Sequence, residues 1–500
     1  MQWIAALLML ALSAPAGLGN DVIWFEGEDA QETNFPKRTW LDPQNDEERA
    51  VLSQGRWLTN AERRARGEEE PFARWQIEAP AAGEYHFWTR KLWKHGPFRW
   101  RFGAQPWESV GRDVALADSV TMRTHVPANW VYLGKVNLRA GTHDLEIRLL
   151  AGEGEEKTAG FDCFVLTRGL FIPNGKLKPG QRSGAAETGF FAWEPAPDPF
   201  SDSPIDLRHL NEPVAGRSGR LQRSDDGNQL LLGDGTPVRL WGVNVNAEIA
   251  AQNRDAIDYM ARRLAKFGVN AVRYHSPLWR DNDYTRIDPK KLDDLHYLVH
   301  ALKQQGIYTS ISFYFPLWMD AKKAGLDGYN NGQHPFGAIF FDGALQSMHR
   351  GWLRQMLTPV NPYTQLPLGR DPAVSMVELV NEDSLLFWTM TKRNIPPPQW
   401  RKLEQKAGGA VMEAWHMTRE GIGNDARKAT QMRKQVQTLA TMQRDFYVAS
   451  RRFLIDDLGY EGLVIASNWT TADPTILDAA ERWSYTGADV SDRHGYFGGK

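Results

Sequence analysis

The stretch AVSMVELVNEDSLLFW, residues 373–388, decides how the chain is organised. Its apolar part, residues 374–380, is typical of a strand buried on both faces of a parallel sheet, and the polar turn beginning at Asn381 ends it. A carboxylate just beyond such a strand, here Glu382, lies where barrel enzymes hold their catalytic groups. Glu378 shares the same face but lies roughly 13 Å deeper, at about 3.3 Å per residue, so we expect it to be structural. The alternative for Glu382 is a solvated turn residue.

Length, composition and charge bound the class of protein. The 500 residues are 42% hydrophobic, which is more than one ordinary domain needs and enough for two cores. A net charge of −2, with acidic and basic residues interleaved, argues against nucleic acid or an anionic membrane as a partner. The single cysteine, Cys163, excludes an intrachain disulfide and a thiolate metal cluster.

Residues 1–20 have the pattern of a secretory signal peptide. An apolar run at residues 3–12 precedes Ala14-Pro15-Ala16, a small-x-small cleavage site, and the run is too short to span a bilayer. It departs from the pattern because no Lys or Arg precedes it. No later segment is long and apolar enough for a membrane helix. We therefore expect a secreted or periplasmic protein with no membrane partner after cleavage.

Residues 21–170 carry the signals of a β domain. Short alternating runs, separated by Gly, Pro and Asn turns, occupy residues 85–88, 130–136, 143–149 and 161–166. This spacing predicts a β-sandwich or jelly roll. Three tryptophans near turns, Trp93, Trp100 and Trp107, are candidates for stacking on sugars, although such residues more often belong to a core.

Two motifs give this domain a resemblance to calcium-containing carbohydrate-binding jelly rolls: FEGEDA at residues 25–30 and GFDCFVL at residues 160–166. The resemblance implies a structural calcium held by Glu26, Glu28 and Asp162, and oxygen-only ligands suit a hard cation. The alternative is a solvated edge strand. Neither reading requires a cofactor for catalysis.

Residues 171–218 form a proline-rich linker. They contain Asn211-Glu212-Pro213, which looks like a glycosidase acid/base signature. We interpret it as a decoy because it follows no buried strand and precedes the first strand of the next domain.

Strand and helix alternate through residues 219–500, after a hairpin at residues 229–240. Strands are expected at residues 242–246, 269–275, 307–314, 374–380, 462–467 and 485–490. Helices are expected at residues 253–267, 289–305 and 342–356, with two or three more within 398–458. Repeated βα units predict a parallel sheet and a (β/α)8 TIM barrel. A doubly wound sheet is the alternative, but residues 244–249 lack its glycine-rich loop.

The carboxyl ends of barrel strands converge on one face, so the polar and aromatic residues at those ends are expected to lie close together. These residues are Asn244, Asn246, Arg273, His275, Tyr314, Trp318, Asn381, Glu382, Trp388, Asn468, Trp469, Asp492, His494 and Tyr496. Each alone is weak, and a lone His or Trp is more often structural. Together they predict a polar, indole-rich binding site.

At these strand ends the chain resembles the clan A glycoside hydrolases, of the cellulase and mannanase type of family 5. The residues that carry the resemblance are LWGVN (240–244), NAVR (270–273), VNE (380–382) and HGY (494–496), with NPYT (361–364) and SNW (467–469). It implies that Glu382 is the acid/base and that Asn381 binds the sugar 2-hydroxyl. It also implies that Arg273 supports the nucleophile and that His494 and Tyr496 line the cleft.

Two positions depart from the family pattern. The third strand ends in Phe-Tyr-Phe-Pro at residues 313–316, without the histidine often found there, and Asp383 stands where proline usually follows Asn-Glu. The substrate class within the clan is therefore left open.

Retaining hydrolysis needs a second carboxylate about 5–5.5 Å from the acid/base. The resemblance implies a glutamate that ends a seventh strand, but the glutamates after Glu382 lie in helical or connecting segments. Asp492 is the candidate within the chain. We therefore expect a barrel truncated at Lys500 after about six strands, with its nucleophile beyond Lys500. Alone, such a fragment is expected to be inactive and poorly soluble.

The sequence thus predicts a secreted retaining glycoside hydrolase, endo-acting on a β-linked polysaccharide or oligosaccharide. Burial and a neighbouring carboxylate are expected to hold up the pKa of Glu382. Trp279, Trp318 and Trp388 in open loops favour an endo-acting cleft. The alternatives are a non-catalytic glycan-binding protein on a barrel scaffold and a transglycosylase, which differs only in excluding water.

Overall fold

The computed structural model describes residues 21–496 except 64–68, 93–95, 112–113, 151–155, 196 and 281–282. It divides into two compact units between Pro199 and Phe200. The predicted signal peptide and Trp93 lie outside the described residues. In the part that is described, none of the helices has the length and apolar character needed to cross a membrane.

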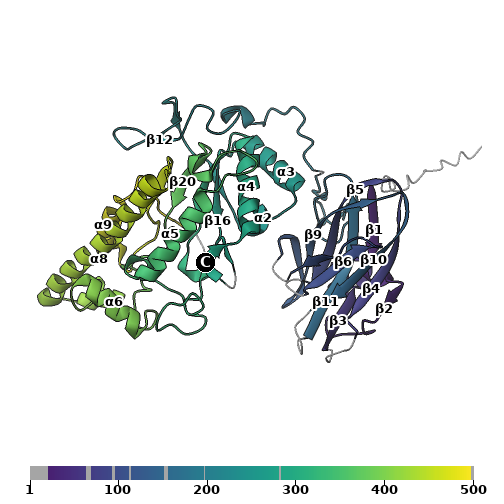
Figure 1. Ribbon diagram of the computed structural model, residues 1–500, viewed down its shortest axis with the longest axis horizontal. Coiled ribbons are helices and arrows are strands. Elements are labelled where there is room, and N and C mark those ends of the chain that lie inside the picture. The colour runs from purple at the N-terminus through teal and green to yellow at the C-terminus, as the bar shows by residue number, and fades with distance from the viewer. Residues whose placement is uncertain are drawn as a thin grey trace, which may run out of the picture. The chain divides into compact units, whose positions relative to one another are not determined.

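The N-terminal unit consists of two antiparallel sheets (Figure 1). One has the order β1-β11-β5-β9-β8, with β3 also paired to β11, and the other has the order β2-β4-β10-β6-β7. The strands of the first are β1 (Val22–Glu26), β3 (Leu58–Arg63), β5 (Gly83–Leu92), β8 (Leu116–Arg123), β9 (Val126–Leu138) and β11 (Glu156–Thr167). Those of the second are β2 (Glu32–Thr33), β4 (Phe72–Ala79), β6 (Phe98–Phe102), β7 (Glu108–Val110) and β10 (Gly141–Leu149). Short helices α1 (Asp46–Val51), η1 (Gly27–Asp29) and η2 (Ser53–Gly55) join them.

An aromatic core lies between these sheets, as expected for a sandwich. Phe87 of β5 meets Trp100 of β6 edge-on at 5.0 Å between ring centroids, and Trp75 of β4 meets Phe164 of β11 at 5.0 Å. Side chains alternate along β6, so Phe98, Trp100 and Phe102 face inward while the arginines between them face outward. The prediction of a β-sandwich is therefore confirmed.

The suggested sugar-stacking role of Trp100 is wrong, because its side chain is 2% exposed and belongs to that core. Trp107 is half-buried, and the guanidinium groups of Arg99 and Arg101 lie 4.6 and 4.3 Å from its ring. Two cations therefore already lie against the Trp107 ring.

The connector carries one short helix, η3 (Arg208–Leu210), and then the Asn211-Glu212-Pro213 motif. The Glu212 carboxylate accepts hydrogen bonds from the backbone N–H groups of Gly216 and Ser218 and from the Tyr308 hydroxyl. Tyr308 begins a strand of the parallel sheet, so Glu212 lies at the amino end of that sheet. This placement supports the interpretation of the motif as a decoy.

The C-terminal unit is built around a parallel sheet whose strands follow one another in chain order. These are β15 (Gly242–Val245), β16 (Ala271–His275), β19 (Tyr308–Ser312), β20 (Val374–Glu378) and β21 (Leu463–Ile465). A doubly wound sheet reverses its order, whereas this order is typical of βα units wound in one direction. Two small antiparallel sheets accompany it: β12 (Gln222–Arg223), β13 (Leu230–Leu231) and β14 (Pro237–Val238), and the pair β17 (Trp279–Arg280) and β18 (Asp283–Ile287). The described strands leave this sheet open, so a closed barrel stays a prediction.

Helices connect the parallel strands (Figure 1). They are α2 (Ala247–Ala250), α3 (Arg254–Lys266), α4 (Pro289–Lys303), α5 (Gly343–Leu357), α6 (Pro397–Ala407), α7 (Arg419–Ile422), α8 (Ala426–Arg452) and α9 (Pro474–Tyr485). Shorter turns of helix are η4 (Pro316–Trp318), η5 (Ala338–Phe340), η6 (Leu368–Arg370), η7 (Ala414–Met417) and the π-helix η8 (Phe453–Asp457). Helices α3, α4, α5, α8 and α9 begin at Asn or Asp N-caps, such as Asn253 and Asp288, whose side chains accept hydrogen bonds from backbone N–H groups. The predicted helices at 253–267, 289–305 and 342–356 are confirmed.

The predicted sixth strand at residues 485–490 is wrong. Helix α9 continues to Tyr485, and hydrogen bonds of the helical type close the turn as far as Ala488. Only Val490 then forms a parallel bridge, with Ile465. The Tyr485 side chain is buried and its hydroxyl accepts the Trp469 N–H at 3.0 Å, which favours the helical end over a strand.

Candidate active site

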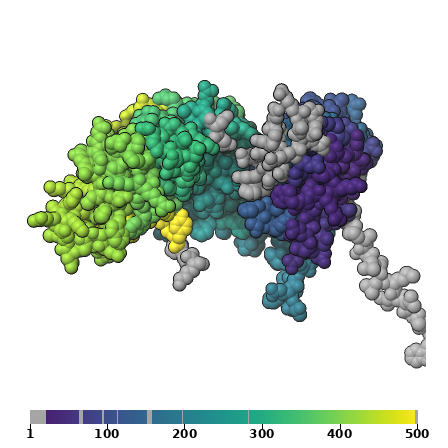
Figure 2. Space-filling model, turned by 90° about the horizontal axis from the view of Figure 1, so that it is seen from below, coloured from purple at the N-terminus to yellow at the C-terminus, as the bar shows by residue number. Residues whose placement is uncertain are grey.

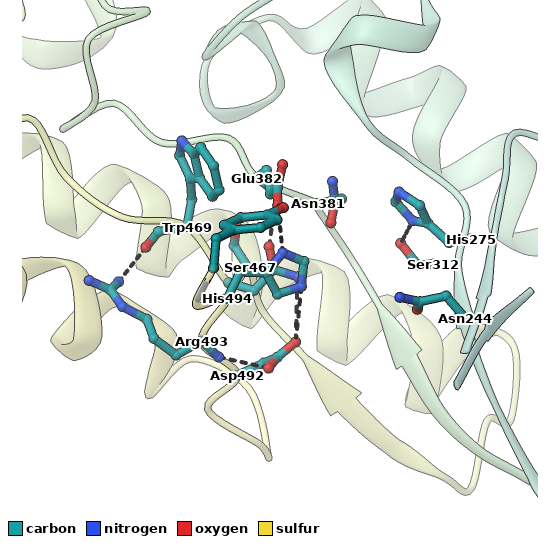
Figure 3. Close-up of polar contacts among 12 residues, drawn as sticks. Asn244, His275, Ser312, Asn381, Glu382, Ser467, Trp469, Asp492, Arg493 and His494 are labelled. Carbon is teal, nitrogen blue, oxygen red and sulfur yellow. Dashed lines mark hydrogen bonds and ion pairs between the residues drawn. The ribbon is translucent and has the colours of Figure 1, made fainter. Parts of the chain in front are cut away.

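A cavity of about 580 Å³ lies at the carboxyl ends of the parallel strands (Figure 3). Its lining residues are Asn244, Arg273, His275, Phe315, Asn381, Glu382, Arg493, His494, Gly495 and Tyr496. The first strands supply Asn244, Arg273 and His275, and the segment after Val490 supplies the last four. The last described residues, coloured yellow, lie on the surface of this unit (Figure 2).

Glu382 has a backbone conformation that is rare for a residue other than glycine, with φ of 46°. Such a conformation costs about 1–3 kcal/mol and persists where the surrounding structure holds it. Here the Glu382 N–H donates to Asn468 Oδ1 at 2.9 Å, and the preceding Asn381 N–H donates to the Tyr314 carbonyl at 2.9 Å. The following residue, Asp383, is held by the Gly337 N–H at 2.9 Å. Strain of this kind is typical of functional sites.

The Glu382 carboxylate is the acceptor of two short hydrogen bonds. Its Oε1 atom accepts from His494 Nδ1 at 2.6 Å and from the Tyr496 hydroxyl at 2.5 Å. The other ring nitrogen of His494 lies 3.8 Å from Asp492 Oδ2, so the imidazole stands between the two carboxylates (Figure 3). The donors come from a segment far along the chain from Glu382.

Burial raises the pKa of Glu382, but the hydrogen bonds from His494 and Tyr496 outweigh it, so the pKa lies below its usual value. The expectation that a neighbouring carboxylate holds this pKa up is therefore wrong for this arrangement. Asp492 lies on the far side of the His494 ring, and its charge is separated from Glu382 by that ring.

Arg273 links the floor of the cavity to the residue before Glu382. Its Nε and Nη2 atoms donate to the two oxygens of Glu378 at 2.9 and 2.8 Å, and Nη2 also donates to Asn381 Oδ1 at 2.8 Å. Ser312 donates its hydroxyl to Glu378 Oε1 at 2.7 Å. Glu378 is 1% exposed, and this pairing supports the prediction that it is structural. The fixed Asn381 oxygen leaves the amide nitrogen of the same side chain as the donor for a ligand.

His275 is held as a neutral imidazole. Burial, together with the charges of Arg273 and His494, lowers its pKa to about 4, although Glu382 acts in the other direction. One ring nitrogen, Nδ1, lies 2.9 Å from Ser312 Oγ, and the ring packs on Trp318 at 4.5 Å between centroids. His275 therefore offers the cavity an uncharged polar group at neutral pH.

The structure brings seven of the fourteen predicted site residues into the lining of the cavity. Among the others, Tyr314 is buried, Asn246 caps helix α2 and Trp318 packs on the His275 ring. Asn468 holds the backbone of Glu382, and Trp469 lies 6.4 Å from the Tyr496 ring, both behind the lining residues. Trp388 lies on the loop beyond Glu382 and is not a lining residue of the cavity. The expectation that Trp279 faces an open loop is wrong, because it is 4% exposed and packs on Trp352.

Three residues of the site were not predicted: Ser312, Phe315 and Arg493. Ser312 lies on the same face of β19 as Ser310, and the inward parity of that strand is the signal that could have identified it. Arg493 donates to the Trp469 carbonyl and to Asp478, contacts that the sequence pattern does not reveal.

Behind Glu382 lies a buried network of two further carboxyls. The Ser384 hydroxyl donates to Glu481 Oε2 at 2.6 Å, and Gln443 bonds both Glu481 and the backbone of Leu385. Burial raises the pKa of Asp383 and of Glu481 to about 7. This network anchors the start of the loop that follows Glu382.

These two carboxyls predict a pH dependence of stability. In the unfolded chain they titrate near 3.8 and 4.5, whereas in the folded protein they titrate at about 7. Between these pH values the folded protein binds more protons than the unfolded chain, so the free energy of unfolding falls as the pH rises. The stability that the protonated Asp383 and Glu481 carboxyls contribute is lost above about pH 7. We expect Glu481→Gln to show a smaller fall in melting temperature than the parent between pH 4.5 and 7.5. Equal falls in Glu481→Gln, the parent and a control at the exposed Glu420, Glu420→Gln, would contradict this.

The predicted calcium residues of the sandwich differ in how well they fit a cation. Glu26 Oε2 and both carboxylate oxygens of Glu28 are buried without a hydrogen-bond partner in the described part of the chain. Burial, with the charges of Glu26 and Asp162, raises the pKa of Glu28 to about 7. Asp162, by contrast, pairs with Arg90 at 2.6 Å and accepts the Ser53 N–H at 2.8 Å.

The Oε2 atoms of Glu26 and Glu28 suit a hard cation, whereas Glu28 Oε1 lies 3.7 Å from Arg56 Nε and Asp162 is already engaged. Within the described ranges, no group of three His, Cys, Asp or Glu side chains has an arrangement that would hold a metal ion. Structural calcium therefore stays a prediction, carried by Glu26 and Glu28.

If calcium binds there, a chelator should lower the melting temperature of the sandwich and added calcium should restore it, because an ion bound only by the folded state stabilises that state. Glu28→Gln should lose this response, while Glu32→Gln, at an exposed position, should keep it. Differential scanning calorimetry with and without metal tests this. If the parent gives the same melting curve with and without calcium, Glu26 and Glu28 are buried carboxylates that bind no metal.

Comparison with known proteins finds only solved structures of low similarity. No protein-family model matches the chain, and no curated protein matches it. Solved structures similar to it include an endo-1,4-beta-mannanase from Rhizomucor miehei, which is 11% identical, with 55% of this chain and 90% of that chain covered and a TM-score of 0.30. An endo-beta-1,4-mannanase from Thermotoga petrophila is 12% identical over 52% of this chain and 68% of its own, with a TM-score of 0.27. A CBM35 from Cellvibrio japonicus Abf62 is 9% identical over 30% of this chain and 94% of its own, with a TM-score of 0.20. Similarity this low does not decide function, which is inferred from the site.

Proposed function

We propose that this chain is a retaining glycoside hydrolase in which Glu382 is the general acid/base. The observation that carries the proposal is a strained glutamate at the carboxyl end of β20, opening into a cavity of about 580 Å³. Two donors, His494 and Tyr496, orient its carboxylate, and Arg273 orients the neighbouring Asn381. The resemblance at residues 380–382 and 494–496 supports the same assignment.

The proposed reaction uses Glu382 in both protonation states. As the acid, it gives its proton to the leaving glycosidic oxygen while a second carboxylate attacks the anomeric carbon. As the base, it takes a proton from the water that hydrolyses the glycosyl-enzyme. In this proposal the Asn381 amide nitrogen donates to the sugar 2-hydroxyl.

The low pKa of Glu382 in this arrangement has a direct consequence for that cycle. With His494 and Tyr496 donating to it, the free carboxylate is ionised and ready to act as a base. To act as an acid, Glu382 must be protonated. The negative charge of the nucleophile carboxylate close by raises the pKa of Glu382 and so favours that form. Once that nucleophile is consumed in the glycosyl-enzyme, the pKa falls again and Glu382 accepts the proton from water.

The nucleophile is proposed to be the strand-ending glutamate that the resemblance implies, outside the described residues. The described cavity lining offers no second carboxylate besides Glu382. Asp492 faces the His494 ring instead. The proposal includes a closed (β/α)8 barrel and needs no catalytic cofactor.

The finer reading is an endo-acting enzyme on a β-linked polysaccharide, secreted or periplasmic. The signal-like residues 1–20 support export, and the sandwich supports a glycan partner through its resemblance to carbohydrate-binding jelly rolls. The exposed Trp388, on the loop after β20, supports a substrate that extends beyond the cavity.

The test is a screen of hydrolysis products. The protein, expressed from its complete reading frame, is incubated with purified β-glucans, mannans, xylans and algal polysaccharides, and the products are separated by size. Short oligosaccharides from one class support the proposal. Binding without product release would favour the non-catalytic alternative, and oligosaccharides longer than the donor would favour the transglycosylase.

A further inference from the structure

Two tryptophans that follow Glu382 in the chain lie together and are both exposed. Trp388 is 45% exposed and Trp415 is 44% exposed, and their ring centroids lie 6.3 Å apart with a tilt of 35° between the planes. Indole is the largest apolar side chain, and leaving two together in water is costly unless they bind something.

The segment that carries Trp388 is otherwise well packed. It runs from Asp383 to Met390, and both of these residues are buried, as are Leu385 and Leu386. The Leu385 N–H donates to Gln443 Oε1 at 2.6 Å, and the Met390 N–H donates to the Phe387 carbonyl at 2.9 Å. The exposure of Trp388 is therefore not the result of a loose loop.

Trp415 is anchored separately, on η7. Its carbonyl accepts hydrogen bonds from the Thr418 N–H at 3.2 Å and the Thr418 hydroxyl at 2.8 Å. A Cβ atom on Gly421 would lie 2.0 Å from the same carbonyl, so only glycine fits there. The neighbouring Ala414 N–H donates to the Met390 carbonyl at 2.9 Å and ties η7 to the first segment. The two indoles thus form a surface that is in place before any ligand binds.

A series of ring contacts runs from Tyr496, beside Glu382, to the residue that precedes Trp388. The Tyr496 hydroxyl donates to Glu382, and the Tyr496 ring lies 6.4 Å from Trp469. Trp469 lies 5.3 Å from Phe387, the residue that precedes Trp388. The backbone that carries Trp388 therefore lies near the candidate active site.

We propose that Trp388 and Trp415 form a platform that binds sugar units of the substrate beyond those next to Glu382. The face of an aromatic ring is electron-rich and attracts C–H bonds, which pyranose rings with equatorial substituents present on their flat faces. The ligand class is therefore a β-linked chain of pyranose units, long enough to reach from the cavity to the platform. This inference rests on the proposed function and assigns Trp415 a role in it.

The experiment measures binding as a function of chain length. The parent is the Glu382→Gln variant of the whole protein, which cannot turn over its ligand, and the probes are the trisaccharides and hexasaccharides of β-1,4-linked glucose, mannose and xylose. Isothermal titration calorimetry gives the affinity of each. We expect Trp415→Ala in this background to weaken hexasaccharide binding roughly tenfold, in line with the energy of aromatic contacts plus lost area, and to leave trisaccharide binding unchanged.

The matched control is Trp483→Ala, because Trp483 is 47% exposed but lies on α9, where it packs with Arg444. This control should keep the parent affinity for every probe, and Trp415→Phe should fall between Trp415→Ala and the parent. Melting temperatures within the parent range show that each variant is folded.

The outcomes separate the platform from the function on which it rests. If hexasaccharides bind the parent and Trp415→Ala binds them equally well, the platform is wrong while the proposed function stands. Equal losses for trisaccharides and hexasaccharides, or the same loss in Trp483→Ala, would also overturn it. If none of the probes binds the parent, both the platform and the proposed function fall.

Discussion

Glu382→Gln is expected to abolish glycan hydrolysis while leaving oligosaccharide binding intact. The amide keeps the shape of the side chain, and its oxygen can still accept from His494 and Tyr496, but it can neither give nor take the proton. General acid–base catalysis contributes about 10²–10⁴ in rate, so a loss of at least that size is expected in kcat on substrates with poor leaving groups.

Azide distinguishes loss of the acid/base from general damage. It attacks the anomeric carbon of the glycosyl-enzyme without needing a proton removed, and the nucleophile carboxylate leaves. Two displacements at that carbon preserve its configuration. The variant should therefore release a glycosyl azide of the same anomeric form as the substrate, whereas Glu420→Gln, an exposed control, should behave like the parent. Parental rates in Glu382→Gln would end the assignment.

Arg273→Met is expected to cause the largest loss of stability in the C-terminal unit. The Glu378 side chain is 0% exposed and Arg273 is 18% exposed, so the substitution leaves a buried carboxylate without its partner. Removing one partner of a buried pair costs about 3–5 kcal/mol, and Asn381 and Ser312 lose a donor as well. Urea denaturation at pH 7 measures the free energy of unfolding.

The double variant Arg273→Met/Glu378→Gln is the matched control. It removes the stranded charge, so it should recover a large part of the stability lost in the single variant. It should not recover hydrolysis, because Asn381 still lacks the donor that orients it. A single variant as stable as the parent would show that Glu378 finds another partner.

Much of the fold can be predicted from local patterns in the sequence. Apolar runs that end in polar turns mark the parallel strands β15, β16, β19, β20 and β21, and the strand at residues 374–380 indicates where the carboxylate lies. Because parallel strands share a direction, the residues at their carboxyl ends could be assigned to one cavity before any distance was known. Asn244, Arg273, Asn381, Glu382 and His494 are assembled in this way.

What could not be predicted depends on contacts between distant segments. The pKa of Glu382 is lowered by donors from the segment after Val490, and no pattern around residue 382 indicates their approach. An aromatic residue near a turn can face either way, so Trp100 and Trp279 proved to be core while Trp388 is exposed. The apolar residues near Tyr485 suit the end of a helix as well as a strand, and its hydroxyl bond to Trp469 decides between them.

The measurement that tests retaining hydrolysis by this site most directly is the anomeric configuration of the first product. Proton NMR follows the reaction of the protein, expressed from its complete reading frame, with the β-linked substrate that the screen identifies. Retention through Glu382 and a nucleophile predicts that the β-anomer appears first and that the α-anomer grows only by mutarotation. An α-anomer that appears first, or β-product formed equally fast by Glu382→Gln, would contradict it.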